Sequence, residues 1–216
     1  PNQSESFMMM REDKSELPDV YLSGPNQWPK FENFKEVLEK YTFNMTKLGR
    51  NLMRLALLSS GVKDSSVMQS LDTPTIWLRL LHYPPISKNS PSDLYGSAPH
   101  TDFGCLTILA QDEIGGLQVQ TREGEWIDVP KLEGSFVVNV GEMLSRYTNG
   151  LLRSTPHRVI NKSGKERFSC PFFFDPHTNA VVQPLKGTGE PKFSPINFGE
   201  FLREELEASY EKHKKV

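Results

Sequence analysis

The chain has little of what would place it among secreted, membrane-spanning or nucleic-acid-binding proteins. Its 216 residues include only two cysteines, Cys105 and Cys170, too few for a disulfide framework. The 25 basic residues nearly balance the 27 acidic ones, so no basic surface dominates that would bind nucleic acid. No apolar run reaches the length of a membrane span. We therefore expect a cytoplasmic protein with reduced cysteines and neither a nucleic-acid nor a membrane partner.

The first residues differ in pattern from the rest of the chain. The sequence begins with Pro1 and not with methionine, and residues 1 to about 29 are interrupted by Pro18, Gly24, Pro25 and Pro29. We expect this segment to be mostly loop, with room for one short strand. We also expect the sequence to be a fragment that lacks an N-terminal region of its parent protein.

Two helical patterns are present. From Phe31 to Leu55, apolar residues recur at alternating steps of three and four, which predicts one apolar face on a helix that ends near Gly61. We interpret this face as packing on the core, since a coiled coil would need more heptads. A second amphipathic helix is expected from about Asn197 to Lys212. The apolar face of the first helix comprises Phe31, Phe34, Leu38, Tyr41, Met45, Leu48, Leu52 and Leu55.

The stretch between the helices has the pattern of short strands separated by turns. Many short strands at this spacing are typical of a sandwich or a jelly-roll barrel. A chain of this length forms one domain by default. We expect a mainly β fold with flanking helices, a double-stranded β-helix, in one domain over residues 1–216. The expected strands are Thr75–Tyr83, Cys105–Ala110, Leu117–Thr121, Trp126–Val129, Ser135–Val140, His157–Asn161, Arg167–Phe174 and Ala180–Val182.

Three residues form a candidate metal site. His100 and Asp102 are two positions apart, so on a strand both would face the same way. His157 must arrive from another strand, because three ligands on one face of an ion cannot come from a single extended segment. Two histidines and one carboxylate can occupy one face of an octahedral Fe(II) ion and leave the opposite face open. We expect His82, His177 and His213 not to be ligands.

A second motif follows ten residues after His157. Arg167 and Ser169 would share one face of a strand, where the guanidinium can bind a carboxylate bidentately and the hydroxyl can add a hydrogen bond. A buried arginine is costly without an anionic partner. Two interpretations are open: an ion pair with a carboxylate of the protein, or a site for an oxoacid co-substrate beside the iron.

Together these motifs resemble the catalytic domain of the Fe(II)/2-oxoglutarate-dependent dioxygenases, in the branch that contains isopenicillin N synthase, gibberellin oxidases and flavonoid oxidases. The resemblance spans nearly the whole chain, although Leu81 stands where many plant members have asparagine. Family members have a further N-terminal region, which we expect this chain to lack. The supporting segments are Gly24–Pro29, His82–Pro85, Gly116–Val119, Trp126–Pro130, Val137–Glu142 and Asn149–Gly150.

The resemblance implies roles for the residues of the site. His100, Asp102 and His157 would bind the catalytic iron, and Arg167 and Ser169 would hold the far carboxylate of 2-oxoglutarate. Two aromatic residues would lie beside them. Tyr83 would reach toward the same co-substrate, unless it is a core tyrosine at a strand end. Phe173 shares face parity with Arg167 and Ser169 and could line the substrate site, although aromatics on barrel strands more often serve packing.

The implied activity couples oxidative decarboxylation of 2-oxoglutarate by O2 to hydroxylation or desaturation of a small organic substrate. One alternative is an oxidase similar to isopenicillin N synthase or aminocyclopropane-carboxylate oxidase, which does not consume 2-oxoglutarate. Another is a binding module without catalysis. Succinate formation separates the first two, and failure to bind iron would favour the third. The sequence leaves the substrate and the oligomeric state open.

Overall fold

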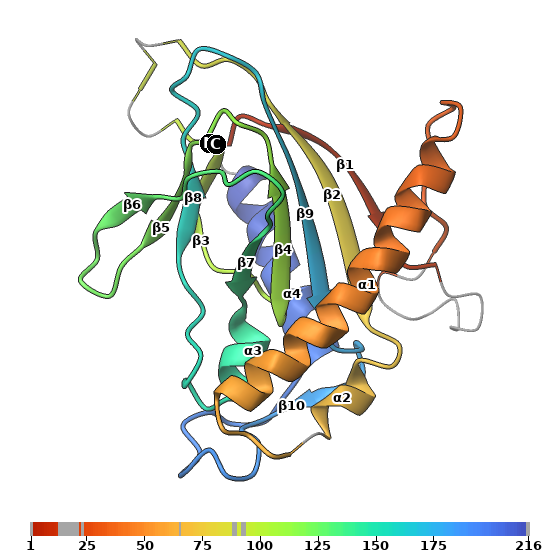
Figure 1. Ribbon diagram of the computed structural model, residues 1–216, viewed down its shortest axis with the longest axis vertical. Coiled ribbons are helices and arrows are strands. Elements are labelled where there is room, and N and C mark those ends of the chain that lie inside the picture. The colour runs from red at the N-terminus through yellow and green to blue at the C-terminus, as the bar shows by residue number, and fades with distance from the viewer. Residues whose placement is uncertain are drawn as a thin grey trace.

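Two antiparallel sheets form the body of the protein, and one long helix crosses the outer face of the larger sheet (Figure 1). The computed structural model describes residues 2–12, 22, 24–64, 66–87, 90–91 and 94–214, with side chains described as far as residue 209. Its two antiparallel sheets, with few helices, have the mainly β architecture expected of a jelly-roll fold.

The five-stranded sheet has the order β1-β2-β9-β4-β7, and the four-stranded sheet has the order β3-β8-β5-β6. Two further short strands, β10 and β11, pair with each other. The five-stranded sheet consists of β1 (Glu5–Met10), β2 (Thr75–Tyr83), β9 (Arg167–Asp175), β4 (Leu106–Gln111) and β7 (Val137–Val140). The other strands are β3 (Ser97–His100), β8 (His157–Val159), β5 (Leu117–Gln120), β6 (Trp126–Asp128), β10 (Val181–Val182) and β11 (Ile196–Asn197).

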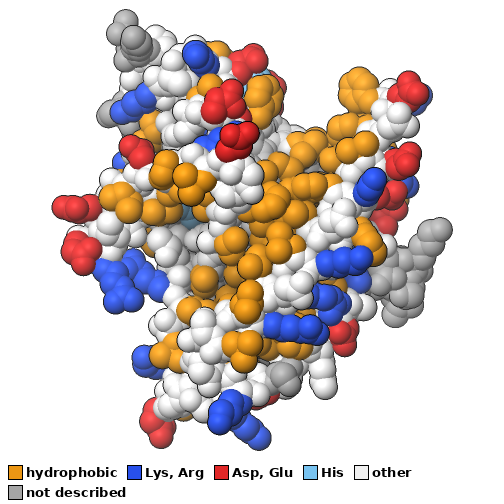
Figure 2. Space-filling view, in the orientation of Figure 1, with side chains coloured by type: hydrophobic (Ala, Val, Ile, Leu, Met, Phe, Trp, Pro, Cys, Tyr) orange, Lys and Arg blue, Asp and Glu red, His pale blue; other side chains and the backbone are white. Residues whose placement is uncertain are grey.

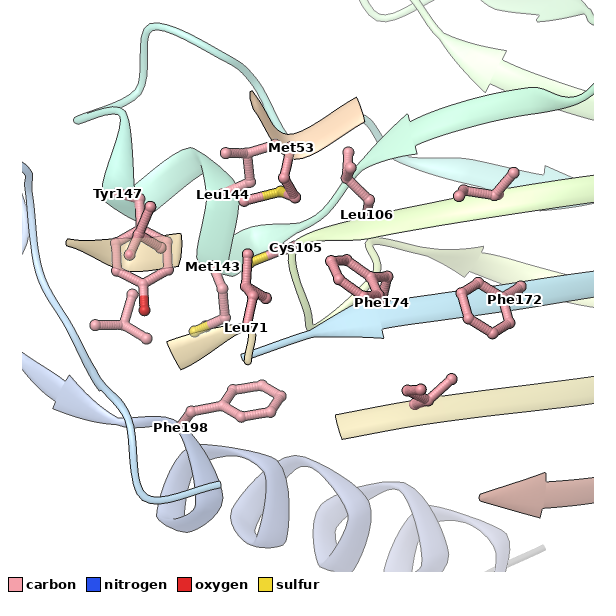
Figure 3. Packing of buried hydrophobic residues seen from close by; sticks show 14 of the residues in the cluster. Met53, Leu71, Cys105, Leu106, Met143, Leu144, Tyr147, Phe172, Phe174 and Phe198 are labelled. Carbon is pink, nitrogen blue, oxygen red and sulfur yellow. The ribbon is translucent and has the colours of Figure 1, made fainter. Parts of the chain in front are cut away.

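Alternation along β2 and β9 divides their side chains between two environments. The even-numbered residues Ile76, Leu78, Phe172 and Phe174 face the helix side, where each is at most 4% exposed. Figure 3 shows Phe172 and Phe174 in the apolar core that also contains Met53 of the long helix. The odd-numbered residues of both strands therefore face the four-stranded sheet, on what we call the inner face of the five-stranded sheet.

The long helix α1 (Phe34–Ser59) confirms the expected helix, but its apolar face is rotated in its second half. Gly49, Met53 and Leu57 are buried, whereas Leu55 is 61% exposed. A pattern with a period of 3.5 drifts relative to a straight helix with 3.6 residues per turn. The prediction that Leu55 faces the core is therefore wrong, as is the prediction for Phe31, which precedes the helix and is 72% exposed.

Several short elements were not expected from the sequence. They are α2 (Val67–Ser70), α3 (Glu142–Tyr147), β3 and β11, each too short to show a clear periodicity. The expected C-terminal helix is present as α4 (Phe198–Lys214), and the short N-terminal strand is present as β1. Both cysteines are free, as expected. Among the helices that the structure describes, none is both long and apolar enough to cross a membrane.

Helix α1 covers only part of the outer face of the five-stranded sheet. Figure 2 shows hydrophobic side chains gathered on this face beside the helix. Val138 on β7 and Phe168 on β9 are 44% and 52% exposed there. The inner face, which carries the site described below, is thus not the only apolar surface of this sheet.

We expect Gly49→Ala to destabilise the protein, although alanine is the better helix former by about 1 kcal/mol. A Cβ at Gly49 would lie 2.7 Å from Cγ of Phe174, a fully buried ring. Overpacking of this kind costs roughly 1–3 kcal/mol and should outweigh the gain in propensity. Urea unfolding measures the difference, and Asn51→Ala on the exposed side of α1 is the control. An equal gain in stability for both variants would contradict this packing.

The end of β9 carries a buried carboxyl group. Asp175 is 5% exposed, and its Oδ1 accepts a hydrogen bond of 2.9 Å from the backbone N–H of Cys105, next to β4. Burial raises the pKa of Asp175 to about 8, although the Cys105 hydrogen bond opposes this shift. In the folded state the group is therefore mostly protonated at pH 7, whereas in the unfolded chain it is ionised.

We expect stability to fall as the pH rises from about 4 to 8, because over this range the folded state binds a proton at Asp175 that the unfolded state releases. Asp175→Asn should remove this contribution, so its advantage over the wild type should grow by more than about 1 kcal/mol between pH 5 and 8. Urea unfolding of the metal-free proteins at several pH values tests this expectation. Parallel pH profiles of the two proteins would contradict it.

Candidate metal centre and active site

The three predicted metal ligands converge where the two sheets face each other. His100 ends β3 and is paired with His157, the first residue of β8. One ligand atom from each of His100, Asp102 and His157 lies within 4.8 Å of the others. Strand β3 ends at His100, so Asp102 lies just beyond the strand and before a bend at residues 103–105. The carboxylate of Asp102 and the ring of His100 nevertheless face each other, as their spacing of two residues predicts.

Both imidazole rings present the same nitrogen to Asp102. The Nε2 atoms of His100 and His157 lie 3.8 Å and 3.5 Å from Oδ1 of Asp102. Each Nδ1 lies within hydrogen-bond distance of a backbone oxygen, 2.8 Å from Ala98 and 3.1 Å from Thr155. Donation from Nδ1 to a carbonyl fixes the tautomer and leaves the Nε2 lone pair free for a metal.

Two polar side chains from the larger sheet orient the Asp102 carboxylate. Its Oδ2 accepts hydrogen bonds from Thr107 Oγ1 on β4 at 2.6 Å and from Asn139 Nδ2 on β7 at 2.7 Å. Asp102 is 6% exposed, and its Oδ1 is the atom that faces both histidines. Neighbours of this kind position a ligand for its metal. Neither Thr107 nor Asn139 was predicted from the sequence, although Asn139 lies within one of the family-like segments.

The charge states of the cluster suit a cation. Desolvation lowers the pKa of His100 from its ordinary value, and the neighbouring His157 lowers it further, whereas Asp102 opposes the shift. A neutral His100 at pH 7 keeps the lone pair that a metal ligand needs. Two imidazoles and one carboxylate form a nitrogen and oxygen donor set that suits Fe(II) and leaves the far face of the ion open.

The segment after Asp102 is held from two sides. The backbone N–H groups of Glu142 and Met143, at the start of α3, donate to the carbonyl oxygens of Asp102 and Gly104. A Cβ at Gly104 would overlap the carboxyl group of Asp175. Only glycine therefore allows this close approach. Helix α3 and Asp175, neither of which the sequence analysis assigned a role, thus fix the ligand segment.

Arg167, Ser169 and Tyr83 come together on the inner face, as their strand parity predicts. Arg167 and Tyr83 are paired across β9 and β2, and Cζ of Arg167 lies 4.7 Å from the centre of the Tyr83 ring. The Ser169 hydroxyl lies 3.5 Å from the Tyr83 hydroxyl. Phe168, between Arg167 and Ser169, faces the opposite way and is 52% exposed.

The guanidinium of Arg167 is buried without a carboxylate partner. It is 1% exposed; its Nε donates to the Gly115 carbonyl at 2.6 Å, and one Nη donates to Gln111 Oε1 at 3.2 Å. The other nitrogen, Nη1, is buried and has no hydrogen-bond partner. No carboxylate of the described residues forms an ion pair with Arg167, so the interpretation as a structural ion pair lacks a partner. A buried, uncompensated cation calls for an anion from outside the chain.

The remaining histidines lie apart from this cluster, as expected where they are described. His82 faces outward, where its ring nitrogens lie 3.3 Å and 3.7 Å from carboxylate oxygens of Glu5 and Glu166 and its ring stacks on Phe168. His177 lies beyond β9, where its Nδ1 accepts a hydrogen bond from the backbone of Asn179. The side chain of His213 lies outside the described residues. Phe173 is partly buried on the inner face, where it pairs with Thr107 and Trp77.

The sequence of this chain matches a family model and several known proteins. Residues 75–176 match the model of the 2OG-Fe(II) oxygenase superfamily. The chain is 37% identical over 198 residues to the 2-oxoglutarate-Fe(II) type oxidoreductase hxnY of Emericella nidulans, a match that covers 87% of this chain and 57% of that protein. The chain therefore spans less than two thirds of this relative.

Solved structures agree with this match. A full-length Neurospora crassa protein, in complex with alpha-KG and thymine, superposes with a TM-score of 0.87 at 31% identity, and the match covers 97% of this chain and 66% of the other. The structure of the same Neurospora crassa protein in complex with alpha-KG and 5-formyluracil also superposes with a TM-score of 0.87, at 30% identity. This match covers 96% of this chain and 70% of the other. JOX2, in complex with 2OG, Fe and JA, gives a TM-score of 0.79 at 29% identity, with 93% of this chain and 59% of its own covered. From its sequence matches, its fold and its ligand cluster, the chain belongs to the 2OG-Fe(II) oxygenase superfamily.

Proposed function

We propose that this protein is an Fe(II)-dependent oxygenase that couples oxidative decarboxylation of 2-oxoglutarate to the oxidation of a small organic substrate. The observation that carries the proposal is the buried, uncompensated guanidinium of Arg167, on the inner face of the sheet that also orients Asp102. An oxoacid with a second carboxylate matches both features, because one end can meet the metal and the other can meet Arg167.

In this proposal each residue of the chain has a defined task. His100, Asp102 and His157 hold the iron, which supplies coordination positions for the oxoacid and O2. Arg167 binds the distal carboxylate through Nη1, with Ser169 and Tyr83 adding hydroxyl groups. The balanced reaction converts 2-oxoglutarate, O2 and a C–H bond of the substrate into succinate, CO2 and an alcohol. Desaturation would instead remove two hydrogen atoms from the substrate and yield an alkene and water in place of the alcohol.

The setting and extent of this activity are also proposals. We propose that residues 1–216 form one catalytic domain and that it works in the cytoplasm, where the free thiols of Cys105 and Cys170 stay reduced. Related oxygenases have been solved with small molecules such as thymine, which supports a small-molecule substrate here. Succinate formation from 2-oxoglutarate, in the presence of Fe(II) and O2, tests the proposal directly. Iron binding without succinate formation, across a panel of substrates, would favour an oxidase that spares 2-oxoglutarate.

We expect His157→Ala to lower the affinity for iron at least about 100-fold, because it removes one of three donors; loss of a group that only orients a ligand already costs about 10–100-fold. Anaerobic calorimetry with Fe(II) measures this affinity. His82→Gln is the control, since His82 faces outward, away from the cluster. Unchanged iron affinity in His157→Ala would remove His157 from the site.

We expect Arg167→Ala to weaken 2-oxoglutarate binding at least about tenfold, because a charge-assisted hydrogen bond in a buried site is lost. Iron should stay bound, since Arg167 contacts none of its ligands. Anaerobic calorimetry with 2-oxoglutarate on the iron-loaded protein provides the measurement. Arg158→Ala is the control, because the guanidinium of Arg158 donates to Gln118 and lies over the Trp126 ring, away from Arg167. Equal 2-oxoglutarate affinity in both variants would contradict the role of Arg167.

A further inference from the structure

A second arginine on the inner face, Arg79 of β2, is not used by the iron or by the proposed 2-oxoglutarate site. It has the same parity as Leu81 and Tyr83, which pack in the apolar cluster between the two sheets. The even-numbered neighbour Leu78 has the parity of Ile76, on the helix side, and is 1% exposed. The side chain of Arg79 therefore leaves the strand toward the same interior as Tyr83.

Arg79 has no anionic partner among the described residues. It lies two positions from Trp77 and four from Tyr83 on the same face of β2. Its Nε donates to the Ser6 hydroxyl of β1 at 3.0 Å, the one hydrogen bond found for it among the described residues. None of the carboxylates described in the chain forms an ion pair with it. Arg79 is partly exposed, and a guanidinium without a carboxylate partner favours an anionic ligand.

The surroundings of Arg79 are flat and apolar. Trp77 precedes it by two positions on the same face and pairs with Phe173 of β9. Both rings are partly buried, and the Trp77 Nε1 is buried without a hydrogen-bond partner. Met8, paired with Arg79 across β1, is 41% exposed, so solvent reaches this edge of the inner face. Aromatic surface, one free indole donor and one free cation are thus grouped on neighbouring strands.

The register sets the distance between this group and the metal ligands. Phe173 pairs with Trp77 on one side and with Thr107, which binds Asp102, on the other. Two strand spacings separate β2 from β4, or roughly 10 Å. A molecule with one ring system and a short acidic side chain can span such a distance.

We propose that Arg79 binds a carboxylate of the substrate that is oxidised, and that this substrate is a small acid with a flat, aromatic body that lies against Trp77 and Phe173. This inference rests on the proposed function, because it assigns the substrate class of the same site. Each arginine then binds a different acid: Arg167 binds the oxoacid co-substrate, and Arg79 binds the acid to be oxidised.

The test compares three acids with their neutral amides as probes: benzoate with benzamide, nicotinate with nicotinamide, and indole-3-acetate with indole-3-acetamide. Ligand-detected NMR measures their affinities for the anaerobic full chain with Fe(II) and 2-oxoglutarate. We expect at least one acid to bind about tenfold more tightly than its amide, the effect of one charge-assisted hydrogen bond. In Arg79→Gln that preference should fall below about twofold, whereas Arg79→Lys, which keeps the charge, should retain part of it.

Controls separate this inference from general charge effects and from the proposed function. Arg54→Gln removes the same charge from an exposed position on α1 and should keep the preference for the acid. The comparison is repeated on the iron-free protein, so the result for Arg79 does not depend on the iron. Acids that bind no better than amides, or a preference that persists in Arg79→Gln, would overturn the role of Arg79. Absence of 2-oxoglutarate binding would instead overturn the proposed function.

Discussion

The alternation of side chains along β2 and β9 determines where both the core and the site of this protein lie. It sends Phe172 and Phe174 into the apolar core under α1 and sends Arg167 and Ser169 to the inner face. The same two strands therefore provide stability on one side and polar chemistry on the other. A shift of one residue in their register would bury Phe168 at the site and expose Arg167, so core packing and site geometry are specified together.

The metal-ligand segment depends on this sheet without belonging to it. Asp102 lies between β3 and a bend at residues 103–105, yet its carboxylate is fixed by Thr107 and Asn139, which extend from paired positions on β4 and β7. Helix α3 binds the backbone of the bend, and the close approach of Asp175 to Gly104 holds its far end. The strands thus provide a rigid base that orients ligands located on a loop and on two short strands.

Much of this arrangement could be predicted from the sequence, because it follows from short-range rules. An apolar run of strand length predicted β2 with its observed bounds, and the period of two predicted correctly that Arg167 and Ser169 share a face. The bend at residues 103–105 and helix α3 could not be predicted, since six or fewer residues carry no clear period and their conformations depend on distant partners such as Asp175. Arg79 was missed for a similar reason: its lack of an anionic partner is visible only when the interior is assembled.

The central claim is that the His100, Asp102 and His157 cluster and the Arg167 guanidinium form one site for iron and an oxoacid. An anaerobic titration with Fe(II), followed by 2-oxoglutarate, tests it most directly, because a bidentate oxoacid on Fe(II) produces a visible charge-transfer band. We expect the band to appear and to saturate at one 2-oxoglutarate per iron. Iron binding without the band, or no iron binding at all, would contradict it.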